Sequence, residues 1–289
     1  MSVIVISRNE GLYLSRTIEN LAATLPEGGE IVIVDDCSTD GSTDCLPARR
    51  KVRLLRPAQR LGAIVGRNFG ARHAAAPILV FSDAHIETPR NWFEPMKRAL
   101  QRPEVGAVGT VYSEMNCRQS KGYGLRFTDA SLNWTWLDLQ SSGPYPVPML
   151  GGFFLGMRRD VFAKIGGFDP GLITWGMEDV EIAVRIWTLG YQCLLIPTVD
   201  VAHLSRQNDS FPGYQCDWET GLHNTLRVAI LHFGPDRIRR VVQHYAGDPC
   251  FPKALARILT GDTWAVRSKL HQIRKYDDSW FFQKFRMSL

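Results

Sequence analysis

Hydrophobic and polar positions follow two different patterns in the first third of the chain. Short runs rich in Val and Ile predict strands at residues 3–7, 31–34, 52–55, 78–81 and 105–111. Apolar residues three or four positions apart predict helices at residues 12–25, 63–75 and 92–100. Strands that alternate with helices are typical of an α/β fold. We therefore expect a mostly parallel sheet flanked by helices on both faces.

The pattern changes after residue 112. Residues 113–147 are rich in Ser, Gly, Pro and aromatics and show no steady periodicity, which is typical of a functional or mobile segment. Further strands are expected at 148–157, 194–197 and 199–202, and further helices at 160–165 and 177–189. Helical patterns dominate from Asp217 onward. We predict a sheet domain over residues 1–215 and a helical C-terminal extension over residues 216–289, packed on that domain.

Composition narrows the class of protein but not its ligand. The 289 residues are 45% hydrophobic, as in a globular protein, and carry a net charge of +5. A mildly basic chain suits an anionic small ligand as well as a nucleic acid or a membrane surface. The six cysteines are scattered without zinc spacing, and no apolar run approaches the ~18 residues of a membrane span. We expect reduced thiols and a soluble, cytoplasmic protein.

Polar residues gather where the predicted parallel strands end. Ligands of open α/β sheets bind beyond the carboxyl ends of the strands. Asp35 and Asp36 close one strand, and a carboxylate there can accept hydrogen bonds from a nucleobase or from ribose hydroxyls. A helix cap accounts for these acids equally well. No GxGxxG follows the first strand, so a dinucleotide-binding dehydrogenase loses its main support.

The stretch FSDAHIE, residues 81–87, has the spacing of a metal site. Side chains at positions i and i+2 of an extended chain point to the same side, so Asp83 and His85 project together from a strand end. His203, at the end of a later predicted strand, would complete a set of three ligands. Polar residues at a strand end and a structural histidine are the alternative explanations.

Glycines mark two places where a ligand would approach the backbone. Gly62 stands at the entry of a helix next to Arg60, and both the helix N-terminus and the guanidinium favour phosphate. Gly151 and Gly152 interrupt an otherwise buried strand, which removes side chains where another group lies against the chain. Solvated surface arginines are the alternative reading of Arg60 and of Arg67.

Two acids open the predicted helix at 177–189. Glu178 and Asp179 follow Trp175 and Gly176, and the helix dipole favours the ionised carboxylates. The same stabilisation makes acids common in a first helical turn, so a purely structural role stays open for both residues.

The order of these motifs resembles the catalytic domain of metal-dependent GT-A glycosyltransferases. The motifs are Asp35-Asp36, Asp83-x-His85, Gly151-Gly152, Trp175-Gly-x-Glu178-Asp179 and His203. The chain is most similar to the polypeptide N-acetylgalactosaminyltransferases and their bacterial family 2 relatives, which carry DxH where most GT-A enzymes carry DxD. The resemblance runs from about residue 3 to residue 227 and includes Arg60-x-Gly62. It implies a GT-A, Rossmann-like fold.

The resemblance implies a role for each matching residue. Asp83, His85 and His203 would bind a divalent cation, manganese with magnesium as the alternative. Asp36 and Arg60 would hold the uridine part of the donor, next to Gly62.

The motifs in the second half of the chain would contact the sugar and the diphosphate of the donor. Gly152 and Glu178 would contact the transferred sugar, Trp175 would pack at the sugar and diphosphate, and Arg206 would lie on a loop that closes over the diphosphate.

Two features depart from the peptide-modifying family. Asp179 stands where that family has Asn, and inverting GT-A enzymes use such a Glu-Asp pair as a general base. We favour inversion, with retention as the outcome if Asp179 is only a cap. The family's lectin domain has no counterpart, which leaves the acceptor open. Trp134, Trp136 and Tyr145 would stack on a sugar, or are buried aromatics.

We therefore predict a glycosyltransferase that uses a UDP-sugar donor and a divalent metal. The donor is expected to be UDP-GalNAc, UDP-GlcNAc, UDP-Gal or UDP-Glc, and the acceptor a protein, peptide, glycan or small molecule. No nucleic-acid partner is expected, and the basic tail would allow peripheral membrane contact. A nucleotidyltransferase lacks support because residues 8–11 are not a Gly-rich, Lys-containing loop. A catalytically degenerate sugar-nucleotide-binding domain is the other alternative.

Overall fold

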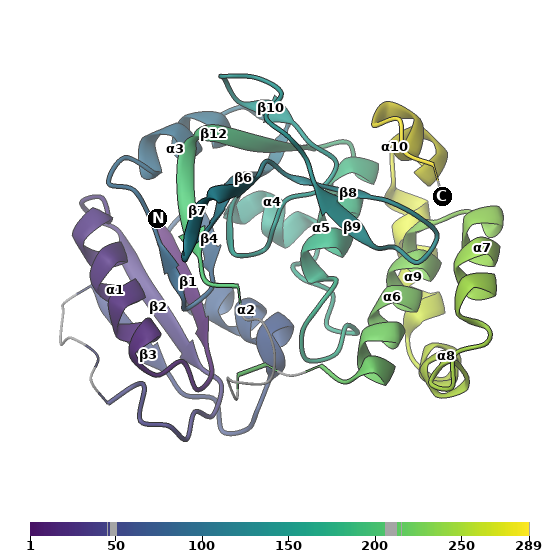
Figure 1. Ribbon diagram of the computed structural model, residues 1–289, viewed down its shortest axis with the longest axis horizontal. Coiled ribbons are helices and arrows are strands. Elements are labelled where there is room, and N and C mark those ends of the chain that lie inside the picture. Colours follow the sequence, from purple (N-terminus) through teal and green to yellow (C-terminus); the bar gives the residue numbers. More distant parts are fainter. Residues whose placement is uncertain (45, 47–50, 206–212, 215, 289) are drawn as a thin grey trace.

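A computed structural model describes the chain except for residues 45, 47–50, 206–212, 215 and 289. Figure 1 shows a central sheet with helices on both faces and a group of helices at one end. The sheet has ten strands, with β10-β12-β6-β11-β4-β1-β2-β3 along its main path. The predicted α/β architecture with a helical C-terminal extension is confirmed.

The first half of the sheet is parallel. It consists of β1 (Ser2–Ser7), β2 (Glu30–Asp35), β3 (Val52–Leu55) and β4 (Ile78–Ser82). Every residue of β1 is buried, because its even-numbered side chains pack toward α2 (Gly62–His73) and its odd-numbered ones toward α1 (Leu12–Thr24). This double coverage explains the continuous apolar run at the start of the sequence.

The second half of the sheet contains strands of both directions. Its long strands are β6 (Val105–Glu114), β11 (Phe154–Arg158) and β12 (Gln192–His203). β11 runs antiparallel between β4 and β6, whereas β12 runs parallel to β6. The short strands β5 (Ile86–Glu87), β7 (Cys117–Gly122) and β10 (Tyr145–Pro146) pair at its edges, and β8 (Leu125–Phe127) and β9 (Trp134–Trp136) form a separate ribbon. The sheet is therefore mixed.

Three predictions for the second half of the sheet differ from the structure. The strand expected at 148–157 begins only at Phe154, so Gly151 and Gly152 lie just before β11 and do not interrupt it. The strands expected at 194–197 and 199–202 are one strand, β12, whose pairing register shifts between Ile196 and Asp200. Pro197 lies in this irregularity, as expected for a residue without an N–H to donate. Residues 113–147 contain several strands of two to six residues, which are too short to produce a clear alternation.

Three more helices flank the sheet and five form the extension. The former are α3 (Phe93–Leu100), α4 (Arg159–Lys164) and α5 (Glu178–Thr188). The latter are α6 (Trp218–His232), α7 (Pro235–Tyr245), α8 (Phe251–Thr260), α9 (Thr263–Ile273) and α10 (Asp278–Lys284).

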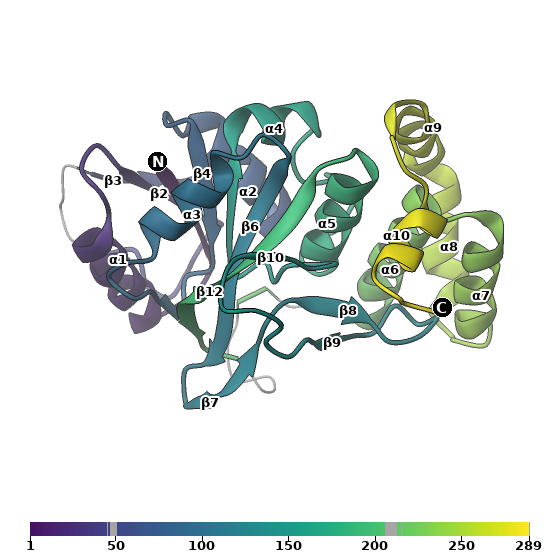
Figure 2. The same cartoon turned by 90° about the horizontal axis from the view of Figure 1, so that it is seen from above.

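The helices of the extension begin at clear sequence signals. The Asp217 carboxylate accepts the Thr220 N–H at 2.7 Å, and Pro235 stands in the first turn of α7. Figure 1 shows α6 on the side of this group that lies toward α5, and α10 also packs against α5 (Figure 2), through Trp280 and Trp187. None of the helices in the described residues has the length and hydropathy to span a membrane. The predicted boundary between residues 215 and 216 stays a prediction.

Candidate active site

The three predicted metal ligands meet at the carboxyl ends of the strands. Asp83 follows β4, and His203 is the last residue of β12. β5 pairs antiparallel with β12, opposing Ile86 and His203, so His85 lies beside His203 with ring centroids 4.8 Å apart. One ligand atom from each of the three side chains lies within 4.8 Å of the other two. The structure therefore brings together residues that lie 120 positions apart in the sequence.

The charge states that Asp83 and His203 favour suit a cation. Burial alone would raise the pKa of Asp83, but the hydrogen bond from His203 at 3.2 Å and the nearby Arg67 cation hold that pKa well below its usual range. Burial lowers the pKa of His203, against the opposing effect of Asp83, so the imidazole is neutral. Its buried Nδ1 has no hydrogen-bond partner among the described residues. An ionised carboxylate and neutral imidazoles are the forms that bind a metal.

The third ligand is oriented by a neighbouring carboxylate. His85 Nδ1 lies 3.0 Å from Glu10 Oε2, in the loop that follows β1. A proton on Nδ1 leaves the lone pair on Nε2, as in the carboxylate–histidine pairs of metal sites. One carboxylate and two imidazoles form a mixed donor set that suits manganese better than calcium. The residues present therefore fit a divalent transition metal.

A buried arginine joins the three predicted metal ligands to Glu178 at the start of α5. The Arg67 guanidinium is 2.8 Å from Asp83 Oδ1 and 2.5 Å from Glu178 Oε1, and it also contacts the Gly152 carbonyl oxygen at 3.3 Å. Its side chain is only 2% exposed. The expectation of a solvated surface arginine is wrong for this residue, because α2 turns it toward the sheet.

A sequence signal for the burial of Arg67 does exist. Ala63, Ile64 and Ala71 are buried in α2, and residue 67 falls on the same helical face at a spacing of three or four. Gly66 and Gly70 allow this helix to pack closely on β1, because an added Cβ would come within 2.4 Å of Ile6 and Ile4. A charged residue on such a closely packed face is buried and requires partners.

The two acids at the start of α5 are held differently. Glu178 accepts from Arg67 and from the Gly176 N–H at 2.8 Å. Asp179 accepts the Gly152 N–H at 3.0 Å and the Val180 N–H at 2.8 Å. Burial, followed by the charge of Glu178, raises the pKa of Asp179 to about 7. An acid with a pKa near neutrality can both accept and release a proton at working pH.

Two glycines permit close contacts inside the site. Gly152 lies against Asp179, since an added Cβ would be 3.2 Å from Cβ of that residue. Gly62 has a φ of +78°, and an added Cβ would be 2.9 Å from the Thr174 Cα. The Ala63 N–H donates to the Thr174 carbonyl at 2.8 Å. Within this structure, the backbone next to Gly62 is covered by the loop that carries Trp175.

The residues predicted to hold the uridine lie together beside α2. The buried Asp36 carboxylate accepts the N–H groups of Leu61 and Gly62 at 2.5 and 3.0 Å, and Arg60 Nε is 4.0 Å away. Asp36 thus stabilises the start of α2, as the helix-cap alternative expected, and its nucleotide role stays a prediction. Arg206, predicted to close over the diphosphate, lies outside the described residues.

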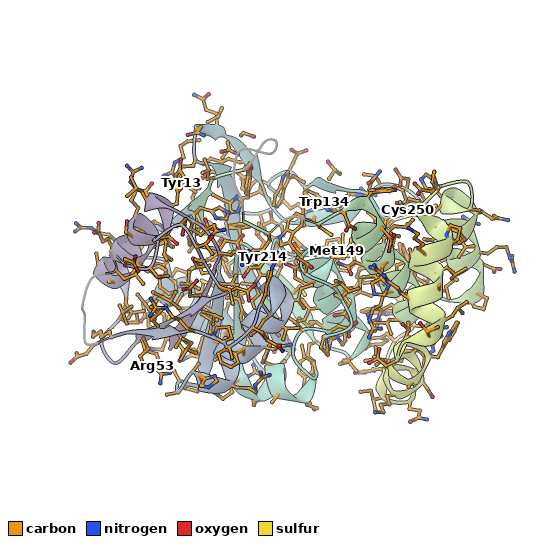
Figure 3. All side chains as sticks on the ribbon, turned by 90° about the horizontal axis from the view of Figure 1, so that it is seen from below. Tyr13, Arg53, Trp134, Met149, Tyr214 and Cys250 are labelled. Carbon is orange, nitrogen blue, oxygen red and sulfur yellow. The ribbon has the colours of Figure 1, made fainter. Side chains whose placement is uncertain are left out.

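Aromatic side chains extend from the metal trio toward the surface. Tyr112 lies 5.8 Å from the ring of His203 and stacks on Trp136 with centroids 4.6 Å apart. Trp134 continues this row and is 46% exposed, on the face viewed in Figure 3. Tyr145 is buried and cannot present its face to a ligand in this structure. Trp175 is half exposed.

Comparisons with known proteins agree with this geometry. The model of glycosyl transferase family 2 matches residues 2–166, more than half of the chain, and the N-terminal domain of galactosyltransferase matches residues 140–207. The crystal structure of GalNAc-T7 with UDP, GalNAc and Mn2+ superposes with a TM-score of 0.80 at 24% identity, covering 99% of this chain and 56% of that one. This similarity confirms the GT-A fold.

Similar sequences include a polypeptide N-acetylgalactosaminyltransferase 11 from Xenopus tropicalis. It is 30% identical over 256 residues, which cover 79% of this chain and 42% of that protein. An inactive polypeptide N-acetylgalactosaminyltransferase-like protein 5 from Macaca fascicularis is 28% identical over 228 residues, covering 71% of this chain and 52% of that protein. The chain thus spans about half the length of these relatives or less. With its family model matched and its fold confirmed, the chain belongs to glycosyl transferase family 2.

Proposed function

We propose that this protein is a metal-dependent glycosyltransferase that uses a UDP-sugar donor. The observation that carries the proposal is the convergence of Asp83, His85 and His203 within 4.8 Å at the carboxyl edge of the sheet. Arg67 joins this trio to Glu178 at the start of α5. Metal dependence is further supported by the related crystal structure, which contains Mn2+ and UDP.

The site provides the groups that the reaction requires. A cation bound by the trio would neutralise the charge that develops on the diphosphate as the anomeric C–O bond breaks. Arg67 stays protonated, because Glu178 and Asp83 raise its pKa although burial would lower it. It fixes Asp83 and Glu178 relative to each other before substrate binds. Preorganised charges of this kind stabilise the transition state without further reorganisation.

Asp179 is proposed as the general base. It would take the proton of the acceptor hydroxyl as that oxygen attacks the anomeric carbon from the face opposite the leaving group, which inverts the anomeric centre. Its pKa of about 7 suits this task. The competing outcome is retention, in which Asp179 only orders the backbone through the N–H groups of Gly152 and Val180.

The names of the relatives support a specific donor and acceptor. We propose UDP-GalNAc as the donor and a polypeptide hydroxyl as the acceptor. The aromatic row of Tyr112, Trp136 and Trp134 leads outward from the metal trio, where an acceptor side chain would pack. Among the described residues five cysteines are free thiols, which supports the predicted cytoplasmic setting. Peripheral membrane contact through the basic tail stays a prediction.

A sugar-nucleotide-binding domain without activity is the second candidate. One relative carries "inactive" in its name, so family membership alone does not decide turnover. In this chain both oxygens of Asp36 are already engaged by backbone N–H groups, and a nucleotide would have to compete for them. Binding of a UDP-sugar without product formation would favour this candidate.

The deciding experiment is a panel of UDP- and GDP-sugars with and without Mn2+, read by release of the nucleoside diphosphate and by mass spectrometry of peptide products. We expect Mn2+-dependent transfer from UDP-GalNAc. His85→Ala should abolish Mn2+ binding in calorimetry and lower turnover by at least about 100-fold, because one of three ligands is lost. His73→Ala is the control, since His73 is an exposed histidine outside the site. Full turnover in His85→Ala would refute the metal assignment.

A further inference from the structure

The loop that leads into Glu178 has a demanding backbone conformation. Residues 169–177 contain neither helix nor strand, and they carry Trp175. Thr174, Gly176 and Met177 have φ values of 57°, 100° and 68°. Positive φ is unfavourable for Thr, whose branched Cβ crowds the backbone. Such a conformation persists only where surrounding groups hold it.

One side chain of the helical extension holds this loop. Asn224 on α6 is fully buried, and within the part of the chain that the structure describes its side chain hydrogen-bonds to residues 173–176. Its Oδ1 accepts the Ile173 N–H at 2.8 Å. Its Nδ2 donates to the carbonyls of Ile173, Trp175 and Gly176 at 3.0, 3.2 and 3.0 Å. An amide is the only neutral side-chain group that supplies both an acceptor and two N–H donors in this way.

The neighbours of Asn224 on α6 fix the start of the same loop. The Arg227 guanidinium binds both oxygens of Asp169, at 2.6 and 2.9 Å. His223 Nε2 lies 3.1 Å from the Gly171 carbonyl oxygen. Gly171 leaves room for the guanidinium, because an added Cβ would be 2.0 Å from the Arg227 Cζ. Polar side chains at three positions of α6 therefore bind residues 169–176.

The loop passes this constraint on to the active site. The Thr174 carbonyl accepts the Ala63 N–H at the start of α2, the helix that carries Arg67. The Gly176 N–H donates to Glu178 Oε2. The backbone ordered by Asn224 is thus bonded directly to the acid predicted to contact the transferred sugar.

We propose that Asn224 is a positioning residue for the donor site, acting through the 173–176 backbone on Trp175 and Glu178. The C-terminal extension is then part of the machinery for donor binding. This inference rests on the proposed glycosyltransferase function, but its structural half, the ordering of the loop, can be measured without turnover.

The experiment compares the full chain with three variants. Asn224→Asp keeps the size and one acceptor oxygen but removes the N–H donors to three carbonyls. Asn224→Ser is the second variant, whose short hydroxyl side chain cannot supply an acceptor and two N–H donors to the same loop. Val241→Ala is the control. Val241 is fully buried in α7, which lies on the side of the extension that is away from the sheet. Each protein is assayed for melting temperature, backbone amide exchange at 169–177, and donor KM and kcat.

We expect Asn224→Asp to accelerate amide exchange at 169–177 and to lower kcat/KM for the UDP-sugar by at least about tenfold, since several hydrogen bonds to the loop are lost. Val241→Ala should lower the melting temperature while leaving loop exchange and kinetics near those of the wild type. Should Asn224→Asp be unfolded, Asn224→Ser gives the same comparison.

Two outcomes separate the inference from the proposed function. Wild-type kinetics and loop exchange in a folded Asn224→Asp or Asn224→Ser protein, or an equal kinetic loss in Val241→Ala, would overturn the positioning role. Absence of any UDP-sugar response in the wild type would instead refute the proposed function, and the exchange data would then decide whether Asn224 orders the loop.

Discussion

The buried Arg67 guanidinium organises the charges of the site. Arg67 pairs with Asp83 on one side and with Glu178 on the other, and burial makes each partner necessary to the others. Asp83 is thereby kept ionised, while burial and the charge of Glu178 raise the pKa of Asp179. The site therefore contains one acid with a lowered pKa, Asp83, and one with a raised pKa, Asp179. Perturbed pKa values of this kind are common among groups with different roles in an active site.

The pKa of Asp179 predicts the pH dependence of the reaction. A general base works only when it is deprotonated, so kcat/KM should fall about tenfold per pH unit below about pH 7 and level off above it. Asp179→Asn should remove this limb and lower kcat by at least about 100-fold. The measurement is a pH–rate profile together with NMR of the product anomer.

The matched control for Asp179 is Asp160→Asn, which alters an exposed carboxylate outside the site. Retained transfer and an unchanged pH profile in Asp179→Asn would exclude the general-base role and leave retention as the stereochemical outcome.

At the scale of elements, two consecutive arginines where β11 meets α4 bind the ends of neighbouring helices. Arg159 donates to the carbonyl of Ala71 in the last turn of α2 and to those of Ala74 and Ala76 just after it, at 2.8 to 3.0 Å. Arg158 donates to the carbonyl of Leu100, the last residue of α3, at 3.0 Å. The last carbonyls of a helix lack partners within the helix, and a cation there also offsets the helix dipole.

Removal of the Arg159 cap should destabilise the fold without changing the site. Arg159→Leu leaves three carbonyls without their donor, and we expect the free energy of unfolding to fall by about 1–3 kcal/mol. Urea denaturation followed by circular dichroism measures this change. Arg90→Leu, at an exposed arginine, should have an effect within about 0.5 kcal/mol. Equal stability of the two variants would show that the cap contributes nothing measurable.

At the scale of the whole molecule, buried polar contacts join the sheet layer to the extension. Glu181 on α5 binds Arg185 of the same helix and, at 2.8 Å, His232 at the end of α6. Glu181 is fully buried. Together with the contacts of Asn224 and Arg227, this pair makes α6 a part of the same folding unit as α5. We therefore expect the sheet and the extension to unfold in one transition.

Glu181 predicts how stability changes with acid. Burial would raise its pKa, but Arg185 and His232 lower it to about 2. An acid with a lowered pKa in the folded state contributes stability above its unfolded pKa of about 4.5, and this contribution is lost as pH falls toward about 2. Glu181→Gln should lower the free energy of unfolding by about 3–5 kcal/mol near pH 7. In this variant the melting temperature should also fall less steeply as the pH is lowered.

Thermal unfolding across pH, with Glu27→Gln as the exposed control, tests this prediction. A Glu181→Gln protein as stable as the control, or one whose melting temperature falls with acid as steeply as that of the wild type, would contradict it.

The sequence alone determined the elements and the order of the motifs. Buried parallel strands and amphipathic helices have periods that are local, so β1, α1 and α2 could be read from a few consecutive residues. The spacing of Asp83 and His85 is local in the same sense, because two residues on one strand share a side. His203 could be named as the third ligand only through the order of the motifs.

Only the tertiary structure decided which distant groups meet. The direction of β11, the partners of Arg67 and the contacts of Asn224 all depend on pairings between segments that lie far apart in the chain. A local pattern records which face of a helix is buried but not which carboxylates lie opposite it. For this reason the three metal ligands could be predicted from the sequence. The arginine that pairs with Asp83 and the asparagine that binds the loop at 173–176 could not.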